Sequence, residues 1–262
     1  METRAFCDPI FKDIPCVVTV GIFDGLHPGH MKIMEETVRT AKKLGAKSVA
    51  VTFSVNPKPG AGAPLLSPAG FKEILTKLGI DFHCVIDFSP DMSKLSGEEF
   101  IALLCTSYRL RAMVVGESFR AGVPSRCVAP SDIGRLLAVH TSSAFLMVVQ
   151  PVVIDGQVVS SSLIRRCLLT GDLAQASRLL GRAYSLDLRD KAFSDEGTDD
   201  TSRKRLFCVR TLGLFLPKAG RYVVEATEDG RCERTAAVVS EDRLTLDLPV
   251  RMNPDGITFL GE

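Results

Sequence analysis

The sequence carries almost no net charge, because 32 lysines and arginines oppose 31 aspartates and glutamates among 262 residues. This balance excludes a strong overall electrostatic preference for nucleic acid or an anionic membrane, so any anion must be bound locally. The most apolar run, residues 144–154, is short and broken by Gln150 and Pro151, which argues against a membrane-spanning helix. The first residues, METRAFCDPIFKD, lack an apolar segment behind a basic start, and we expect no signal peptide.

Closely spaced cysteines are also missing. The eight cysteines are dispersed, with no CxxC motif and no tight cluster of cysteine and histidine. Segments such as PCVVTV and FCVRTL place cysteines among apolar residues, where a reduced cysteine packs as a small core residue. The sequence therefore predicts free thiols and a cytoplasmic location rather than a disulfide framework.

The first 180 residues alternate two kinds of segment. Apolar runs of strand length occur at residues 16–20, 48–53, 82–86, 112–115 and 145–149. Between the earlier runs, apolar residues recur at helical spacing in residues 31–44, 71–78 and 97–108. Strands separated by helices predict an α/β fold with a Rossmann-like, doubly wound parallel sheet.

The composition changes after this region. An Asp155-Gly156 turn predicts a hairpin within residues 152–159, and helices are expected at 162–169 and 173–180, the second capped by Asp172. Residues 185–205 are polar and charged, which favours a linker. Four short β segments, at 206–212, 222–227, 235–239 and 244–248, predict a small all-β barrel-like domain. The expected organisation is a domain over residues 1–184, a polar linker over 185–205 and a β domain over 206–262.

Half of the four histidines lie in one glycine-rich turn, GIFDGLHPGH, directly after the first apolar strand. In a parallel sheet, ligands bind beyond the carboxyl ends of the strands. The helix that follows offers unpaired amides and a positive dipole end, which His27 and His30 would supplement as donors to a phosphate. The alternative is an ordinary strand-to-helix loop with two surface histidines. Asp24 likewise has two interpretations, as a carboxylate that stabilises the turn or as a group near a metal ion.

A second polar cluster precedes the helix expected at 162–169. Ser160, Ser161 and Ser162 could bind phosphate oxygens through their hydroxyls and free amides. Arg165, one turn further along, could form a forked contact with a phosphate. The alternative is a serine N-cap beside a solvated arginine.

Together these motifs resemble a known family. Residues 21–30 closely resemble the signature of the HxGH nucleotidyltransferases, and the FDG element is most similar to the adenylyltransferase module of bacterial FAD synthetases, often fused to a riboflavin kinase. Three more segments resemble that family in the same order along the chain. They are TFSVNP at 52–57, VGESFRAG at 115–122 and VSSSLIR at 159–165, the last followed by a similar helix over 171–184.

The resemblance implies direct attack by the FMN phosphate on the α-phosphorus of ATP, giving FAD and pyrophosphate without a covalent enzyme intermediate. It implies His27, His30 and Arg165 as catalytic residues, and Mg²⁺ held by the ATP phosphates rather than by protein ligands. The implied ATP- and phosphate-binding residues are Gly21, Phe23, Asp24, Gly25, Gly29, Ser160, Ser161 and Ser162. The implied flavin-binding residues are Phe53, Asn56, Pro57, Gly116, Ser118, Phe119 and Arg120. Asn56, Ser118 and Leu163 depart from the residues usual in the family.

The C-terminal part departs further. Residues 214–222 (LFLPKAGRY) resemble a strand of the riboflavin kinase barrel, but the kinase's GRxLGFPTAN stretch is absent between Tyr184 and Leu206. No glutamate matches the kinase's catalytic base, and Glu225 is interpreted as an exposed residue of an alternating strand. We therefore expect no riboflavin kinase activity, and a β domain that serves as a structural remnant or as a surface for protein contact.

Two alternatives to FAD synthesis stay open. The first is nucleotidyl transfer to another phosphorylated acceptor, such as pantetheine phosphate, nicotinamide mononucleotide or glycerol phosphate. The second is a flavin-nucleotide binder that has lost catalysis. The FDG element and the GESF loop favour FMN as the acceptor, and the intact His27 and His30 argue against lost catalysis.

Overall fold

The computed structural model describes residues 1–56, 62–141, 143–197, 202–249 and 252–261. They form two compact units, neither of which is continuous in sequence. The first unit consists of Met1–Phe23, Gly29–Ala61 and Lys72–Val153, and the second of Asp24–Pro28, Gly62–Phe71 and Ile154–Glu262. The histidine-containing turn therefore contributes residues to both units.

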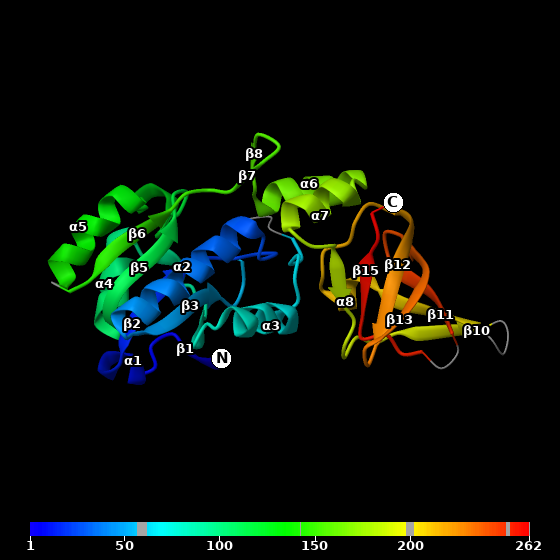
Figure 1. Ribbon diagram of the computed structural model, residues 1–262, viewed down its shortest axis with the longest axis horizontal. Helices are drawn as coiled ribbons and strands as arrows, with labels where there is room; N and C mark the ends of the chain where they lie inside the picture. The colour runs from blue at the N-terminus through cyan, green and yellow to red at the C-terminus, as the bar shows by residue number, and fades with distance from the viewer. Residues whose placement is uncertain (57–61, 142, 198–201, 250–251, 262) are drawn as a thin grey trace. The chain divides into compact units, whose positions relative to one another are not determined.

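The first unit is built on a six-stranded parallel sheet with the strand order β1-β4-β3-β2-β5-β6 (Figure 1). The strands are β1 (Glu2–Ala5), β2 (Pro15–Val20), β3 (Lys47–Phe53), β4 (Phe82–Ile86), β5 (Arg109–Gly116) and β6 (Phe145–Val149). From β2 the chain proceeds outward to β3 and β4, and then returns to β5 and β6 on the other side of β2. This reversal confirms the doubly wound sheet and places a topological switch point beside β2.

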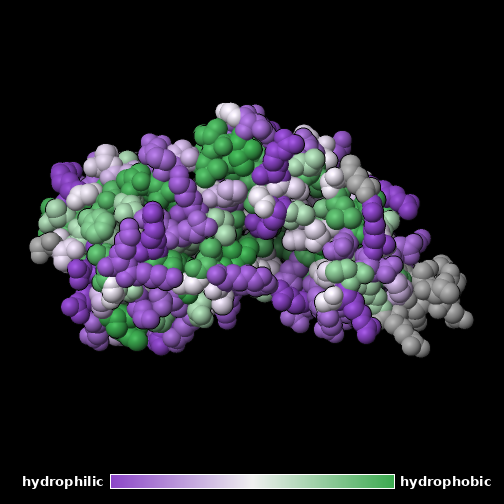
Figure 2. Space-filling view, viewed as in Figure 1, coloured by the Kyte–Doolittle hydropathy of each residue, from purple (hydrophilic) through white to green (hydrophobic). Residues whose placement is uncertain are grey.

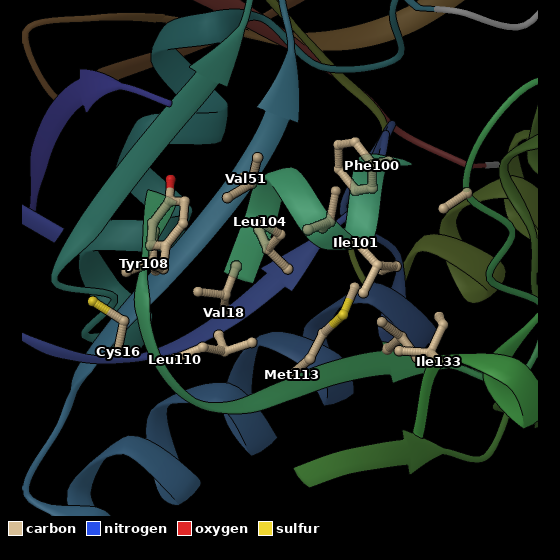
Figure 3. Close-up of a cluster of buried hydrophobic side chains, with 14 of the residues drawn as sticks. Cys16, Val18, Val51, Phe100, Ile101, Leu104, Tyr108, Leu110, Met113 and Ile133 are labelled. Carbon is tan, nitrogen blue, oxygen red and sulfur yellow. The ribbon is translucent and has the colours of Figure 1, made fainter. Parts of the chain in front are cut away.

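Helices cover both faces of this sheet. The helical segments of the region are α1 (Ile10–Asp13), α2 (Pro28–Leu44), α3 (Pro68–Leu78), η1 (Met92–Lys94), α4 (Gly97–Ser107), η2 (Pro124–Arg126) and α5 (Pro130–His140). Val17 packs with Ala41 of α2 on one face, whereas its neighbour Val18 belongs to the larger cluster on the other face. That larger cluster includes Ile101 of α4 and Ile133 of α5 (Figure 3). The alternation follows from the two-residue period of a strand, and because both faces are covered, β2 is buried from Cys16 to Val20.

The second unit contains a seven-stranded antiparallel sheet with the order β10-β11-β14-β13-β12-β15-β9. Its strands are β9 (Ser185–Asp187), β10 (Ser194–Gly197), β11 (Ser202–Cys208), β12 (Gly220–Glu228), β13 (Arg231–Val239), β14 (Arg243–Pro249) and β15 (Gly256–Phe259). The chain between β6 and β12 also forms the hairpin of β7 (Val153–Ile154) and β8 (Gln157–Val158) and the helices α6 (Ser161–Thr170), α7 (Leu173–Leu180) and α8 (Val209–Leu212). Positive φ angles at Asp155 (52°) and Gly156 (74°) confirm the predicted hairpin turn.

The structure differs from the expected organisation in the polar segment 185–205. This segment contributes β9, β10 and the start of β11 rather than a linker. β9 and β10 are the two edge strands of the seven-stranded sheet, where polar side chains can face solvent, so an apolar run is not needed to form them. The compact units do not divide at residue 184. The assignment of adenylyl transfer to residues 1–184 stays a prediction.

Within the described ranges, no helix is both long and apolar enough to cross a bilayer. Figure 2 shows hydrophilic side chains over much of the visible face of each unit, with hydrophobic groups between them. Cys16 and Cys84 are free thiols buried in the parallel-sheet unit, as expected for cysteines that pack as small core residues.

Candidate active site

The signature turn begins where β2 ends. Gly21 donates its amide to the Val51 carbonyl at 3.1 Å, which extends the pairing of β2 with β3 by one residue. A Cβ atom at Gly21 would lie 2.8 Å from the Phe23 ring, so a larger residue there would displace Phe23. Phe23 is buried with a positive φ of 48°, and its ring meets His30 edge to face at 5.3 Å. Gly29 and His30 lie in the first turn of α2, where unpaired amides favour an anion.

The predicted flavin-binding residues follow neighbouring strands of the same sheet. Phe53 ends β3, and Gly116 ends β5. Because these strands are parallel to β2, their carboxyl ends lie at the sheet edge from which Gly21 emerges. Beyond β5, Phe119 is half-buried and donates its amide to the Gly116 carbonyl at 3.0 Å.

The other predicted flavin-binding residues are exposed or outside the described ranges. Asn56 and Ser118 are exposed, and Arg120 is exposed with its guanidinium on the Phe119 carbonyl at 2.6 Å. Pro57 lies outside the described residues. The structure thus gathers Phe53, Gly116 and the residues after it at one edge, and their contact with a flavin stays a prediction.

Side chains from distant parts of the second unit hold the carbonyls of the turn. The Ser161 hydroxyl donates to the Asp24 carbonyl at 2.8 Å. Arg182 donates to the Gly25 carbonyl at 2.7 Å and to the Leu26 carbonyl at 3.2 Å. Three successive carbonyls are therefore each bound by a side chain that follows the β7–β8 hairpin. These contacts hold Gly25 (φ 77°) and Leu26 (φ 41°) in the left-handed region, a conformation that costs about 1–3 kcal/mol for a residue such as leucine.

The Asp24 side chain makes two further contacts. One carboxylate oxygen accepts from the Leu65 amide at 2.8 Å, and the other accepts from Arg165 at 2.6 Å. The Asp24 and Arg165 side chains are only 10% and 15% exposed. The observed contacts are those of a carboxylate that stabilises the turn. Within the described part of the chain, no group of three or more histidine, cysteine, aspartate or glutamate side chains could hold a metal ion.

The serine cluster divides its contacts. Ser160 caps α6, its hydroxyl accepting from the Leu163 amide at 3.2 Å, and Ser161 contacts the turn. Ser162 is exposed on the first turn of α6. Arg165 is not a solvated side chain, because Asp24 and the Ala63 carbonyl, at 2.8 Å, bind one of its nitrogens. The structure thus brings Asp24, Gly25, Ser161 and Arg165 together within one unit.

His27 is the most buried of the polar residues in the turn, with 5% of its surface exposed. Burial is the main cause that lowers the pKa of the imidazole to about 4, with Asp24 opposing the shift and Arg182 adding to it. The side chain is therefore neutral at neutral pH. A neutral imidazole can still donate one N–H to a phosphate oxygen, which is the contact that charge development would strengthen.

Sequence reasoning assigned no role to Arg182, although it lies in the segment 171–184 noted for its resemblance. Arg182 is half-buried, and burial lowers its pKa. A buried cation needs acceptors, and here they are the two carbonyls of the turn. The signal that could have identified it is its position, a charged residue directly after α7 between the apolar Leu180 and Tyr184.

Comparisons with known proteins agree with the family resemblance of the sequence motifs. A sequence model of the FAD synthetase family matches residues 11–163. The chain is 30% identical over 226 residues to a bifunctional riboflavin kinase/FMN adenylyltransferase of Pseudomonas fluorescens, covering 82% of this chain and 70% of that protein. It is 27% identical over 240 residues to the protein of the same name from Listeria monocytogenes, covering 84% and 70%.

A solved structure shares the fold. The crystal structure titled as a macrolide-efflux protein from Streptococcus pneumoniae aligns with a TM-score of 0.79, covering 100% of this chain and 90% of that one. The two sequences are 21% identical, so this likeness is one of fold alone.

Proposed function

Since the chain belongs to the FAD synthetase family, we propose that it transfers AMP from ATP to FMN, giving FAD and pyrophosphate. The observation that supports this most directly is the turn after β2, whose carbonyls are held by Ser161 and Arg182. Holding the carbonyls fixes the backbone between a parallel strand and a helix N-terminus, where phosphates bind. The relatives that carry the same function in their names cover most of the chain.

The proposed reaction requires no covalent bond between the protein and the substrates. An oxygen of the FMN phosphate attacks the α-phosphorus of ATP, the bond from that phosphorus to the bridging oxygen of the β-phosphate breaks, and pyrophosphate leaves. Catalysis then consists of alignment and of neutralising charge. His27 and His30 are assigned as donors to the ATP phosphates, and Ser160, Ser161 and Arg165 as groups at the phosphate site. Gly21 and Gly29 permit close approach of the backbone.

Mg²⁺ fits this site as a companion of ATP rather than as a resident metal. The Asp24 carboxylate is bound by Arg165 and by the Leu65 amide, and so does not offer a free metal ligand. Mg²⁺ commonly binds through phosphate oxygens with few protein ligands. When bound, it would neutralise phosphate charge, while His27 and the α2 amides orient the nucleotide.

Incubation of the protein with ATP, Mg²⁺ and FMN, followed by chromatography, tests the proposal. FAD and pyrophosphate should appear in equal amounts. Tight binding of FMN without FAD would support an inactive flavin-nucleotide binder, and no flavin binding would support another phosphorylated acceptor. Either result would overturn the assignment.

We also propose that the β region over residues 206–262 does not phosphorylate riboflavin. The absence of the GRxLGFPTAN stretch supports this, because its threonine and asparagine serve the metal and the phosphate in the riboflavin kinases that this region resembles. Glu225 lies on β12 and is half-buried rather than fully exposed. ATP-dependent formation of FMN from riboflavin by the purified protein would show that the proposal is wrong.

A further inference from the structure

The loop between α8 and β12 reaches two segments that precede it by many residues. In this loop, the Phe215 amide donates to the Pro64 carbonyl at 2.9 Å, and the Phe215 carbonyl accepts from the Tyr184 hydroxyl. The ring of Phe215 faces Arg165, whose guanidinium carbon lies 4.6 Å from the ring centroid. One residue of the C-terminal β region thus contacts both the loop before α3 and helix α6.

Arg165 is held on two sides. One terminal nitrogen donates to the Asp24 carboxylate at 2.6 Å and to the Ala63 carbonyl at 2.8 Å, and the Phe215 ring covers one face of the guanidinium. The other terminal nitrogen is buried and has no acceptor among the described residues. A buried N–H of a cation without an acceptor is unfavourable, so an oxygen of an anionic ligand would satisfy it.

We propose that Phe215 is a positioning residue for adenylyl transfer, which fixes the plane of the Arg165 guanidinium at the nucleotide phosphate site. The inference rests on the proposed function and extends it to the β region, which acts here as support for the catalytic turn. A guanidinium on an aromatic face keeps its in-plane donors available while rotation of the plane is restricted. The same guanidinium donates to the carboxylate of Asp24, which lies three positions before His27 in the turn.

Substitution can isolate the ring from the rest of the loop. Both hydrogen bonds of Phe215 to other segments use its backbone, and any side chain except proline preserves them. Phe215→Leu removes the ring face, while Phe215→Trp retains and enlarges it. The second unit also provides a matched control, because Arg205 lies 4.4 Å over the Phe193 ring, and neither residue contacts the turn in any described interaction.

Phe215→Leu should reduce kcat/KM for ATP about three- to tenfold, as loss of a partly desolvated cation–π contact would, with KM for FMN unchanged. Phe215→Trp should retain the wild-type kcat/KM for ATP, and Phe193→Leu should leave this value unchanged. In an Arg165→Met background, Phe215→Leu should have no further effect, because the ring acts through the guanidinium. Equal kcat/KM in the wild type and Phe215→Leu, or additive effects with Arg165→Met, would overturn the inference.

A fluorescence titration tests the inference without an acceptor substrate. The chain contains no tryptophan, so Phe215→Trp introduces a single emitting indole. Its emission should change when Mg·ATP is added, and the change should disappear in the Phe215→Trp/Arg165→Met protein. No response to Mg·ATP would refute the positioning role even if the wild type makes FAD. A response in a protein that makes no FAD would refute the proposed acceptor and retain the role of Phe215.

Discussion

Two groups in the second unit use the same three kinds of side chain. In one, Arg165 pairs with Asp24 and lies over Phe215; in the other, Arg205 pairs with Asp195 and lies over Phe193. The first joins residues that are far apart in the sequence, whereas the second joins residues of a single hairpin, β10–β11, and the segment just before it. The same chemistry therefore fixes a turn in one case and an edge hairpin in the other.

The difference between the two groups lies in what they hold. Asp24 precedes His27 by three residues, and its carbonyl, with those of Gly25 and Leu26, is bound by Ser161 and Arg182. Asp195 and Arg205 pair β10 with β11, and Arg205 also lies over Phe193. We therefore expect damage to the first group to affect turnover, and damage to the second to affect stability alone.

The largest effect is expected at the histidines. His27→Ala and His30→Ala should each lower turnover by about 100- to 1,000-fold, as loss of a transition-state donor does, with little loss of fold. Arg205→Met, in the other group, should leave turnover unchanged. Steady-state FAD formation measures the rates, and circular dichroism checks the fold. Wild-type turnover in either histidine variant would show that the assigned role is wrong.

The carboxylates provide a second contrast. Asp24→Asn should lower the free energy of unfolding by about 2–3 kcal/mol, because it leaves the largely buried Arg165 without its charged partner. Asp195→Asn should cost less than Asp24→Asn, because the Asp195 carboxylate is 31% exposed and water screens the pair, although the Arg205 side chain is itself only 8% exposed. Urea unfolding of both variants gives the two values. Equal losses would mean that the two groups do not differ in the way the contacts indicate.

A third prediction concerns pH. Burial lowers the pKa of His27 to about 4, so between pH 6.5 and pH 4 the unfolded chain binds a proton that the folded chain does not. Stability should therefore fall as the pH falls through this range, by up to about 3 kcal/mol from this group. His27→Gln should flatten the curve in urea unfolding at pH 4 to 7, whereas Arg205→Met should retain the wild-type slope. An unchanged slope in His27→Gln would contradict the buried, neutral imidazole.

The smallest effect is expected at the serines. Ser161→Ala removes the hydroxyl that binds the Asp24 carbonyl and should cost about 1 kcal/mol of stability, with a severalfold loss of turnover. Ser162→Ala is the matched control for stability, because this neighbouring side chain is exposed. Thermal unfolding and FAD formation measure the two effects. A greater loss of activity in Ser162→Ala would instead indicate that the exposed hydroxyl contacts the nucleotide.

The sequence was informative where chemistry and periodicity coincide. Five apolar runs predicted β2 to β6, and the Asp172 cap of α7 is confirmed by its contact with the Gln175 amide at 2.9 Å. The helix α5 was overlooked although Ile133, Leu136 and Leu137 have helical spacing and are buried. The edge strands β1, β9 and β10 could not be predicted in this way, since edge pairing does not require apolar residues.

The candidate site was predictable in part. The strand–turn–helix and its histidines were identified from local sequence, because a motif of ten residues contains its own geometry. The ties of Arg182 to the turn and of Phe215 to Arg165 span 157 and 50 positions, and only the folded chain reveals them. The same holds for Arg165, which was interpreted as a phosphate ligand without its carboxylate partner.

The division of the signature motif has a consequence for cooperative opening. Phe23 and His30 belong to one compact unit, while Asp24–Pro28 belong to the other. Proteins open in cooperative units, so amide protons on the two sides of a boundary can exchange with solvent at different rates. In hydrogen exchange, the Leu26 and His27 amides should share the protection of α6 and α7 rather than that of β2. One continuous sequence motif would then be divided between two cooperative units that open separately.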